Sequence, residues 1–409
     1  MRLLFIHQAF PGQFLHAITG LLARGHEVHA IGAGEAAFVP EGCHYHTYAV
    51  VQAQQLPAGL CDPGLELCLI RGERVAALAR ALAQQGFDPA VIVFHSGWGE
   101  GLYLREIWPQ ALLITYPELY GTPSLLETSD PDAPPLDIGR RQLLQRNNLV
   151  SLAALANADV ALSPTLFQRN TFPAPWRSRF QIIHEGIDTE RIKPNHQQVF
   201  RLPGGRVLGS ADLVLTYVSR SLEPLRGFCR FMRALPELLD RHPSLQVVIV
   251  GADDPSYSPP SSHPGGYRGA MLEVLGAAID RDRVHFLGLL QRQQLTALLQ
   301  VSSVHAYLTY PYTVSWSLLE AMACAAVVVG SDTEAVRDVI RHGANGLLVP
   351  LDDTAAITAG LDAVLRDPAA HAHLGLAARE TVLRRFERQQ SVAMFCDWIN
   401  SLLVQRSIR

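Results

Sequence analysis

The sequence contains no CxxC pair, and its start has no hydrophobic run of the length that a membrane span requires. Its six cysteines are spread along the chain at positions 43, 61, 68, 229, 324 and 396. This spacing predicts neither a zinc site nor a redox pair, so we expect reduced thiols in or near the core. The first apolar run, Leu3–Ile6, stops at His7, far short of the roughly 20 residues of a span. We interpret it as a buried strand and expect a cytoplasmic protein.

The chain also lacks a marked charge of either sign. It has 34 basic and 38 acidic residues, for a formal net charge of -4, so its electrostatics give no reason to expect nucleic acid as a partner. No low-complexity tract or short repeat interrupts it. Hydrophobic residues make up 48% and charged residues 18% of the 409, which is typical of a globular protein. The length fits two domains of roughly 150–200 residues each.

Short apolar, β-branched runs alternate with amphipathic stretches through both halves of the chain. In the first half we predict helices over 12–24, 74–85 and 140–156, and strands over 3–6, 27–32, 90–94, 111–116 and 159–162. In the second half we predict helices over 227–241 and 318–323, and strands over 212–218, 245–251, 284–287, 304–308, 326–330 and 346–349. Continuous apolar strands between helices predict a parallel sheet covered on both faces.

The fold class is therefore α/β, with two Rossmann-like domains that we expect to face each other across a cleft. The predicted divisions are an N-terminal domain over 1–190, a C-terminal domain over 191–385, and a C-terminal helix over 386–409 that packs back on the first domain. The Ser-, Pro- and Gly-rich segment Ser256–Gly266 is predicted to be a mobile loop. Ligands of such sheets bind beyond the carboxyl ends of the strands, where we look for a site.

Two segments of the first half place glycines and a histidine at predicted strand ends. Gly12 opens the first predicted helix, and His95 ends the strand over 90–94 within a glycine-rich segment. A glycine at such a place lets a ligand approach the backbone, and a helix N-terminus favours an anion. A tight turn for Gly12 and a buried structural histidine for His95 are the alternatives.

Two arginines follow the first strand of the second half. Arg220 and Arg226 flank a loop that leads into a helix at Gly227. Arginine suits phosphate binding, and a diphosphate carries two charges to neutralise. Surface arginines, or an ion pair with Glu223, are the alternatives.

A carboxylate inside an apolar helix is the last signal. Glu320 lies in the predicted helix over 318–323, shortly after Ser315 and Trp316. A buried carboxylate needs partners, and the two hydroxyl groups of a ribose match its two oxygens. A structural ion pair is the alternative.

At these residues the chain resembles the retaining glycosyltransferases of the two-domain GT-B type, and specifically glycosyltransferase family 4. The resemblance runs from Leu3 to about Trp398, and its most specific parts are the segment over 319–324 and the arginines upstream. It implies transfer of a sugar, with retention of configuration, from a nucleotide-sugar of UDP or GDP type. That donor is a co-substrate, so no cofactor is implied.

The resemblance also implies roles for the site residues. Glu320 resembles the second glutamate of the family's Glu-x7-Glu motif, which holds the donor ribose. Arg220 and Arg226 resemble the pair that grips the diphosphate. Ser315 and Trp316 stand where backbone amides of the family approach the transferred sugar and the phosphate. Gly12 matches the glycine near the phosphates, and His95 matches the residue that contacts the transferred sugar.

Three positions depart from the family pattern. Tyr312 stands where the first glutamate of the motif falls, Ser315 replaces a glycine, and Ala325 replaces another. Glu118 and Glu185 are the candidates for a substitute carboxylate. The departures leave open a sugar-nucleotide-binding protein without transfer activity, or a sugar-nucleotide epimerase on the same fold. Lysine is too scarce for the Schiff base of a pyridoxal-type phosphorylase.

Neither a metal nor a defined acceptor is predicted. No Asp-x-Asp motif stands at a predicted strand end, and Asp253 and Asp254 are adjacent. Family members often extend polysaccharides or glycolipids, so the acceptor stays open. Arg140, Arg141 and Arg146 flank leucines on one predicted helix, which suits either a solvated face or peripheral contact with the inner face of an anionic membrane.

Overall fold

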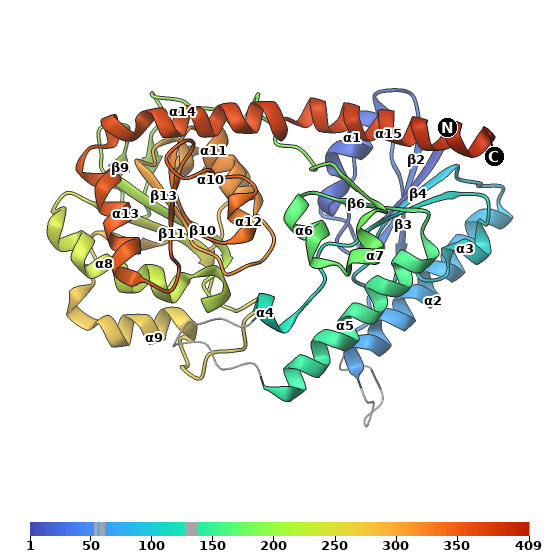
Figure 1. Ribbon diagram of the computed structural model, residues 1–409, viewed down its shortest axis with the longest axis horizontal. Helices are drawn as coiled ribbons and strands as arrows, with labels where there is room; N and C mark the ends of the chain where they lie inside the picture. The colour runs from blue at the N-terminus through green and yellow to red at the C-terminus, as the bar shows by residue number, and fades with distance from the viewer. Residues whose placement is uncertain (53–55, 57–61, 127–136, 409) are drawn as a thin grey trace. The chain divides into compact units, whose positions relative to one another are not determined.

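A computed structural model describes residues 1–52, 56, 62–126 and 137–408. The chain divides into two compact units (Figure 1). Unit 1 contains Met1–Pro123, Asp137–Gly186 and the chain from Arg388 onward, and unit 2 contains Ile187–Glu387 with a short segment that begins at Ser124. The last helix therefore belongs to the same unit as the first strand.

Unit 1 is built on one parallel sheet with the strand order β3-β2-β1-β4-β5-β6-β7. Its strands are β1 (Arg2–Ile6), β2 (Glu27–Ala33), β3 (His44–Tyr48), β4 (Val91–His95), β5 (Leu112–Tyr116), β6 (Val160–Ser163) and β7 (Phe180–Ile182). Its helical segments are η1 (Gly12–Phe14), α1 (Leu15–Leu22), α2 (Pro63–Gln84), α3 (Leu104–Ile107), α5 (Ile138–Asn157), α6 (Leu166–Thr171), α7 (Ala174–Arg177) and α15 (Arg388–Ile408), and α4 (Pro123–Leu126) lies where the units meet in sequence.

The strands of this sheet are apolar throughout because each face has its own core. Along β1, Leu3 and Phe5 belong to one cluster, whereas Leu4 and Ile6 belong to another. Successive side chains of a strand point to opposite faces, so a run of four apolar residues supplies both cores. Helix α15 contributes Phe395 to the first cluster.

Unit 2 repeats this architecture on a parallel sheet with the order β12-β11-β10-β13-β14-β15. Its strands are β10 (Val214–Ser221), β11 (Gln246–Ala252), β12 (Val284–Phe286), β13 (Val304–Tyr307), β14 (Val327–Ser331) and β15 (Leu347–Val349), and β8 (Phe200–Arg201) and β9 (Val207–Leu208) form a separate antiparallel pair. Its helical segments are η3 (Pro224–Arg226), α8 (Phe228–Arg241), α9 (Gly266–Leu275), η4 (Gly276–Ala278), α10 (Arg292–Gln300), α11 (Trp316–Ala323), α12 (Glu334–Arg337), α13 (Thr354–Arg366) and α14 (Pro368–Arg385).

These two parallel sheets confirm the predicted α/β class with two Rossmann-like domains. The periodicity missed β3 and β7, since β3 carries two histidines among five residues and β7 has only three residues. The predicted helix over 12–24 is a 3-10 turn followed by the shorter α1.

The cysteines and the helices agree with two further expectations. The cysteines at 43, 68, 229, 324 and 396 are free, and all of these but Cys43 are buried. Cys61 lies outside the described residues. Among the described helices, none combines the length and the apolarity that crossing a membrane requires.

Candidate active site

In unit 1, histidines at two strand ends have a fixed orientation. His7 follows β1 and His95 ends β4, and both are buried. The Nδ1 atom of His7 accepts the backbone N–H of Ala9 at 3.0 Å, and that of His95 accepts the N–H of Gly97 at 3.2 Å. Because a neutral imidazole has one donor and one acceptor nitrogen, each ring carries its proton on Nε2.

Gly12 lies against the first of these rings. Its φ is +49°, and a Cβ atom at this position would come within 2.5 Å of the His7 imidazole. A side chain at position 12 would therefore displace His7 and strain the turn. This packing explains why glycine stands there, and the predicted approach of a phosphate stays a prediction.

Both histidines direct their Nε2 protons toward the carboxylate of Glu118, His7 through Gln13 and His95 directly. His7 Nε2 donates to Gln13 Oε1 at 2.7 Å, and Gln13 Nε2 donates to Glu118 Oε1 at 3.2 Å. His95 Nε2 lies 3.9 Å from Glu118 Oε2. Burial raises the pKa of Glu118, but the contacts with His95, His7 and Gln13 outweigh it and lower that pKa overall. Burial and the neighbouring His95 lower the pKa of His7 to about 4, so His7 is neutral at neutral pH.

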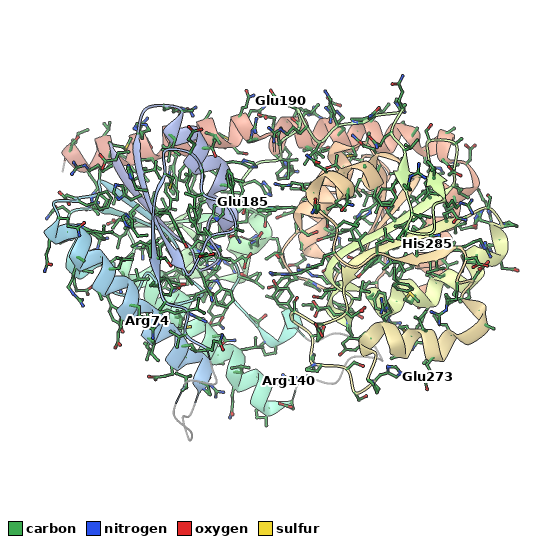
Figure 2. The ribbon with its side chains drawn as sticks, turned by 180° about the vertical axis from the view of Figure 1, so that it is seen from behind. Arg74, Arg140, Glu185, Glu190, Glu273 and His285 are labelled. Carbon is green, nitrogen blue, oxygen red and sulfur yellow. The ribbon has the colours of Figure 1, made fainter. Side chains whose placement is uncertain are left out.

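A second carboxylate of unit 1 is held in the same way. His184 Nδ1 accepts the N–H of Gly186 at 3.0 Å, which leaves Nε2 to donate to Glu185 Oε2 at 3.2 Å. The hydroxyl of Tyr116, at the end of β5, donates to Glu185 Oε1. Glu185 follows β7 (Figure 2), and its side chain is only 8% exposed. Both of its oxygens are thus used inside unit 1.

Glu100 is a further carboxylate close to His95 in sequence. Glu100 is buried and accepts a hydrogen bond from the Tyr48 hydroxyl at 2.8 Å. Burial raises its pKa. Trp98, by contrast, is exposed and stacks near His95, with ring centroids 6.1 Å apart. His95 therefore stays a candidate for ligand contact with the exposed Trp98 beside it, and Glu100 is buried with one oxygen bound to Tyr48.

In unit 2, the predicted arginine pair lies at the carboxyl end of β10. Arg220 is exposed and has no hydrogen bond or ion pair with another described residue. Arg226 ends η3, and its Nη1 lies 3.4 Å from the carbonyl oxygen of Thr313. Gly227 makes the turn into α8 with φ +68°, and a Cβ there would come within 2.6 Å of Leu308.

Two tyrosines flank the guanidinium of Arg226. Its Cζ atom lies 4.7 Å from the ring centroid of Tyr312 and 5.5 Å from that of Tyr257. The two rings are 4.7 Å apart. Tyr312, which stands where the family has a glutamate, therefore holds Arg226 by cation–π contact rather than by charge.

Glu223 forms no ion pair with the arginines in the described part of the chain. It is fully buried, and its Oε2 accepts the backbone N–H groups of Ser256, Tyr257 and Ser258 at 2.9–3.0 Å. The loop predicted over 256–266 is thus fastened at its start to the segment that carries Arg226. This fastening places Tyr257 beside the arginine.

Ser315 and Trp316 form the start of α11. Ser315 has extended dihedral angles that any residue adopts, and no side chain caps the helix. Its Oγ pairs instead with Ser317 Oγ at 2.7 Å, and its N–H donates to the Tyr307 hydroxyl at 2.9 Å. An uncapped N-terminus presents backbone N–H groups and the positive end of the helix dipole, which suits an anionic ligand.

Glu320 is buried on α11, and Arg292 covers it. Arg292 Nη2 donates to Glu320 Oε1 at 3.1 Å, and the arginine itself is half-exposed. Burial raises the pKa of Glu320, and Arg292 opposes that effect. The ion pair that we considered as an alternative therefore exists, and the ribose contact stays a prediction. Arg292 and Tyr257 come from segments without a motif, and Gln13 was not singled out although it follows the candidate Gly12.

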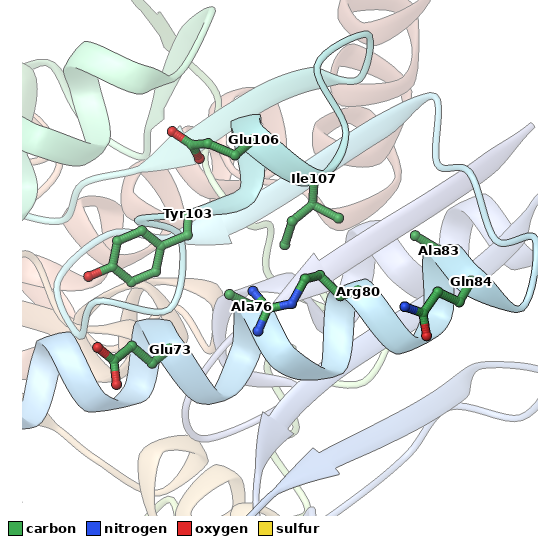
Figure 3. A pocket seen from close by; sticks show the side chains of 8 residues that line it. All are labelled: Glu73, Ala76, Arg80, Ala83, Gln84, Tyr103, Glu106 and Ile107. Carbon is green, nitrogen blue, oxygen red and sulfur yellow. The ribbon is translucent and has the colours of Figure 1, made fainter.

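Three further features of the described residues lie apart from these candidates. No cluster of three or more His, Cys, Asp or Glu in that part of the chain could hold a metal. A groove of about 730 Å³ on unit 1 lies between α2 and α3 and is lined by Glu73, Arg80, Tyr103 and Glu106 among others (Figure 3). Arg140 lies on α5 (Figure 2), whose Arg146 pairs with Asp62.

Solved structures that share this architecture include a sucrose-phosphate synthase and a protein bound to UDP and glucose. Sucrose-phosphate synthase from Thermosynechococcus elongatus aligns with a TM-score of 0.75 over 99% of this chain and 100% of that one, at 19% identity. HepE from Anabaena, solved with UDP and glucose, aligns with a TM-score of 0.70 over 98% and 100%, at 16% identity. These likenesses establish the GT-B class of fold.

The family follows from the sequence matches. "Glycosyl transferase family 4 group" matches residues 24–192, and "Glycosyl transferases group 1" matches residues 212–367. Both models describe glycosyltransferases and together they match most of the chain, which therefore belongs to the glycosyltransferases, as its motifs predicted.

Curated relatives agree at lower coverage. The D-inositol 3-phosphate glycosyltransferase of Rhodococcus opacus is 25% identical to this chain over 68% of its length. The matched region covers 59% of that relative's length. The phosphatidyl-myo-inositol mannosyltransferase of Mycobacterium tuberculosis is 30% identical over 50% of each chain.

Proposed function

We propose that this protein transfers a sugar from a nucleotide-sugar, of UDP or GDP type, to a hydroxyl group of an acceptor, with retention of configuration and without a metal. The observation that carries the proposal is the sheet edge of unit 2, where cationic and helix-terminal groups gather beside a buried carboxylate. The family membership and the fold support it.

The unit 2 groups suit the nucleotide part of the donor. Arg220 and Arg226 bring two positive charges, and the uncapped start of α11 adds backbone N–H groups. As the bond to the sugar breaks, the leaving diphosphate gains negative charge, which such preorganised groups stabilise. Glu320 holds the ribose hydroxyls in this proposal, while Arg292 keeps its charge balanced.

The unit 1 groups suit the sugar. His95 has its Nε2 proton available at a strand end, so it can donate a hydrogen bond to a hydroxyl of the transferred sugar near the reacting carbon. The donor phosphate takes the acceptor's proton in this proposal. No cofactor takes part, because the nucleotide-sugar is itself a substrate.

The acceptor follows from chemistry that the relatives' names share. Inositol phosphate, phosphatidylinositol and malate all offer a hydroxyl group, so we propose a hydroxyl-bearing acceptor of saccharide, glycolipid or similar type. We further propose a cytoplasmic enzyme with peripheral membrane contact through Arg140 and Arg141 of α5.

A donor panel with product analysis tests the proposal. UDP-, GDP-, ADP- and TDP-sugars are first ranked by thermal shift, and the best donor is incubated with hydroxyl-bearing acceptors with and without EDTA. We expect a new glycoside whose anomeric configuration, read by NMR, matches the donor, and full activity in EDTA. Loss of activity in EDTA that magnesium or manganese restores would contradict the metal-free mechanism.

Tyr312 favours one rival function. Because a tyrosine replaces the first glutamate of the motif, a sugar-nucleotide-binding protein without transfer activity is the second candidate. Donor binding without any product identifies it, whereas a changed sugar with no acceptor consumed identifies an epimerase.

A further inference from the structure

Glu118 is a carboxylate at the strand ends of unit 1 that is both oriented and accessible. It follows β5 at the carboxyl edge of the sheet, and its side chain is 36% exposed, whereas the neighbouring His95 side chain is 4% exposed. Glu185 is 8% exposed, and its two oxygens are bound to Tyr116 and His184. Glu118 therefore differs from Glu185 in having a surface that a ligand can reach.

A hydrogen bond holds Oε1 of Glu118, and the facing His95 ring orients Oε2 without using its acceptor capacity. Gln13 donates to Oε1 at 3.2 Å, and the protonated nitrogen of His95 faces Oε2 at 3.9 Å, beyond a full hydrogen bond. A carboxylate offers about four lone-pair sites. Acceptor capacity therefore remains on a group whose orientation is set by buried neighbours.

This orientation originates in the backbone. Ala9 and Gly97 set the two imidazole tautomers, so the chain from His7 through Gln13 points every donor toward Glu118. The same contacts lower the pKa of Glu118, and the carboxylate is ionised at neutral pH. An ionised, oriented and partly exposed carboxylate repels phosphate and accepts hydrogen bonds from hydroxyl groups.

We propose that Glu118 binds a hydroxyl group of a substrate of this enzyme, and that Gln13 and His95 hold it in position. The proposal rests on the proposed function. It assigns to unit 1 a contact between a carboxylate and a hydroxyl group. In unit 2 of this chain, Tyr312 stands where the family motif has its first glutamate. The hydroxyl belongs either to the transferred sugar or to the acceptor, and kinetics separate these two sources.

The test compares Glu118→Gln and Glu118→Ala with the control Glu106→Gln, which removes an exposed carboxylate of α3 in the same unit. Melting temperature, affinity for the free nucleoside diphosphate, donor hydrolysis without acceptor, and full transfer kinetics are measured for each. We expect both Glu118 variants to melt and bind the nucleotide as the wild type does, and to lose about 10- to 100-fold in kcat/KM for transfer. The control should lose nothing.

The pattern of loss identifies the hydroxyl. If it belongs to the transferred sugar, donor hydrolysis falls together with transfer. If it belongs to the acceptor, hydrolysis is unchanged and the KM for the acceptor rises. Folded Glu118 variants with normal transfer kinetics would overturn the proposal, as would a loss that follows melting temperature alone. If the wild-type protein transfers no sugar, the proposed function is wrong, and the Glu118 proposal is tested by binding alone. The wild type should then bind the nucleotide-sugar more tightly than the free nucleotide, and Glu118→Gln should reduce that difference in affinity.

Discussion

The carboxyl edges of the two sheets are built from similar strands but satisfy their polar groups differently. In unit 1, the titratable groups bind one another, as in the chain from His7 to Glu118. In unit 2, backbone N–H groups bind one oxygen of the buried Glu223, its other oxygen has no hydrogen-bond partner among the described residues, and Arg220 has no partner among them either.

This difference shows how one architecture supports two kinds of recognition. A histidine beside an oriented carboxylate can discriminate hydroxyl groups by hydrogen-bond direction, whereas guanidinium groups without a carboxylate partner among the described residues can attract an anion at longer range. In the proposed function, the edge of unit 2 binds the nucleotide and the edge of unit 1 contacts the sugar. Substitutions in unit 2 should therefore lower nucleotide affinity, whereas substitutions in unit 1 should lower turnover.

The largest effect is expected at Glu320 of unit 2. Glu320→Gln removes the charge that we assign to the ribose, so nucleotide-sugar affinity measured by calorimetry should fall below detection while the protein stays folded. Arg292→Gln is the matched control, because it breaks the same ion pair and leaves the carboxylate. Equal donor affinity in both variants and the wild type would reduce Glu320 to a structural role.

The arginines of unit 2 come next. Arg220→Ala and Arg226→Ala should each cost about 2–4 kcal/mol of transition-state stabilisation, read from kcat/KM, because each removes a donor to the leaving diphosphate. Arg226→Lys should cost less, since it keeps the charge. Arg384→Ala on α14, an exposed arginine paired with Glu380, should be silent. Normal turnover in both site variants would place the phosphates elsewhere.

His95 tests whether unit 1 takes part at all. His95→Ala should lower turnover about 10²-fold or more, the scale of a positioned catalytic group, with nucleotide affinity unchanged because the nucleotide is assigned to unit 2. Melting temperature, affinity and turnover are measured on one preparation, with His95→Gln as a variant that retains volume in this buried position. Reduced stability with full activity per folded molecule would make His95 structural.

The smallest effect concerns backbone strain in unit 2. Ala325 has φ 60°, a left-handed conformation that costs a residue with a Cβ roughly 1–2 kcal/mol. Ala325→Gly relieves it but adds freedom to the unfolded chain, so we expect a gain of about 0.5–1 kcal/mol in the free energy of unfolding, measured by urea titration. Ala325→Val should destabilise instead. A Gly variant less stable than the wild type would contradict this account.

Much of the fold could be predicted from the sequence because apolar strands covered on both faces have a distinctive composition. The run over 3–6 and the run over 245–251 both became central strands. The polar edge strand β3 could not be predicted, because its pairing with β2 rather than an apolar pattern defines it.

Sequence motifs singled out residues for the candidate site but could not predict the contacts that these residues make. Arg226 and Glu320 were signalled by motif, yet Tyr257 reaches Arg226 from a loop 31 positions along the chain, and Arg292 reaches Glu320 from α10. Such pairs depend on tertiary packing, which no local pattern encodes. The repeated His-x-Ala or His-x-Gly spacing at 7, 95 and 184 was the signal that could have fixed the tautomers.

The assignment of α15 to unit 1 bears on how the protein is made. Val392, Phe395 and Ile399 fill the core beside β1, yet the ribosome synthesises them almost four hundred residues later. During translation, part of one apolar face of the first sheet therefore stays uncovered while the main segment of unit 2, Ile187–Glu387, can fold. A nascent chain of this protein should consequently recruit chaperones to the segment around β1, and that demand should end only when α15 leaves the exit tunnel.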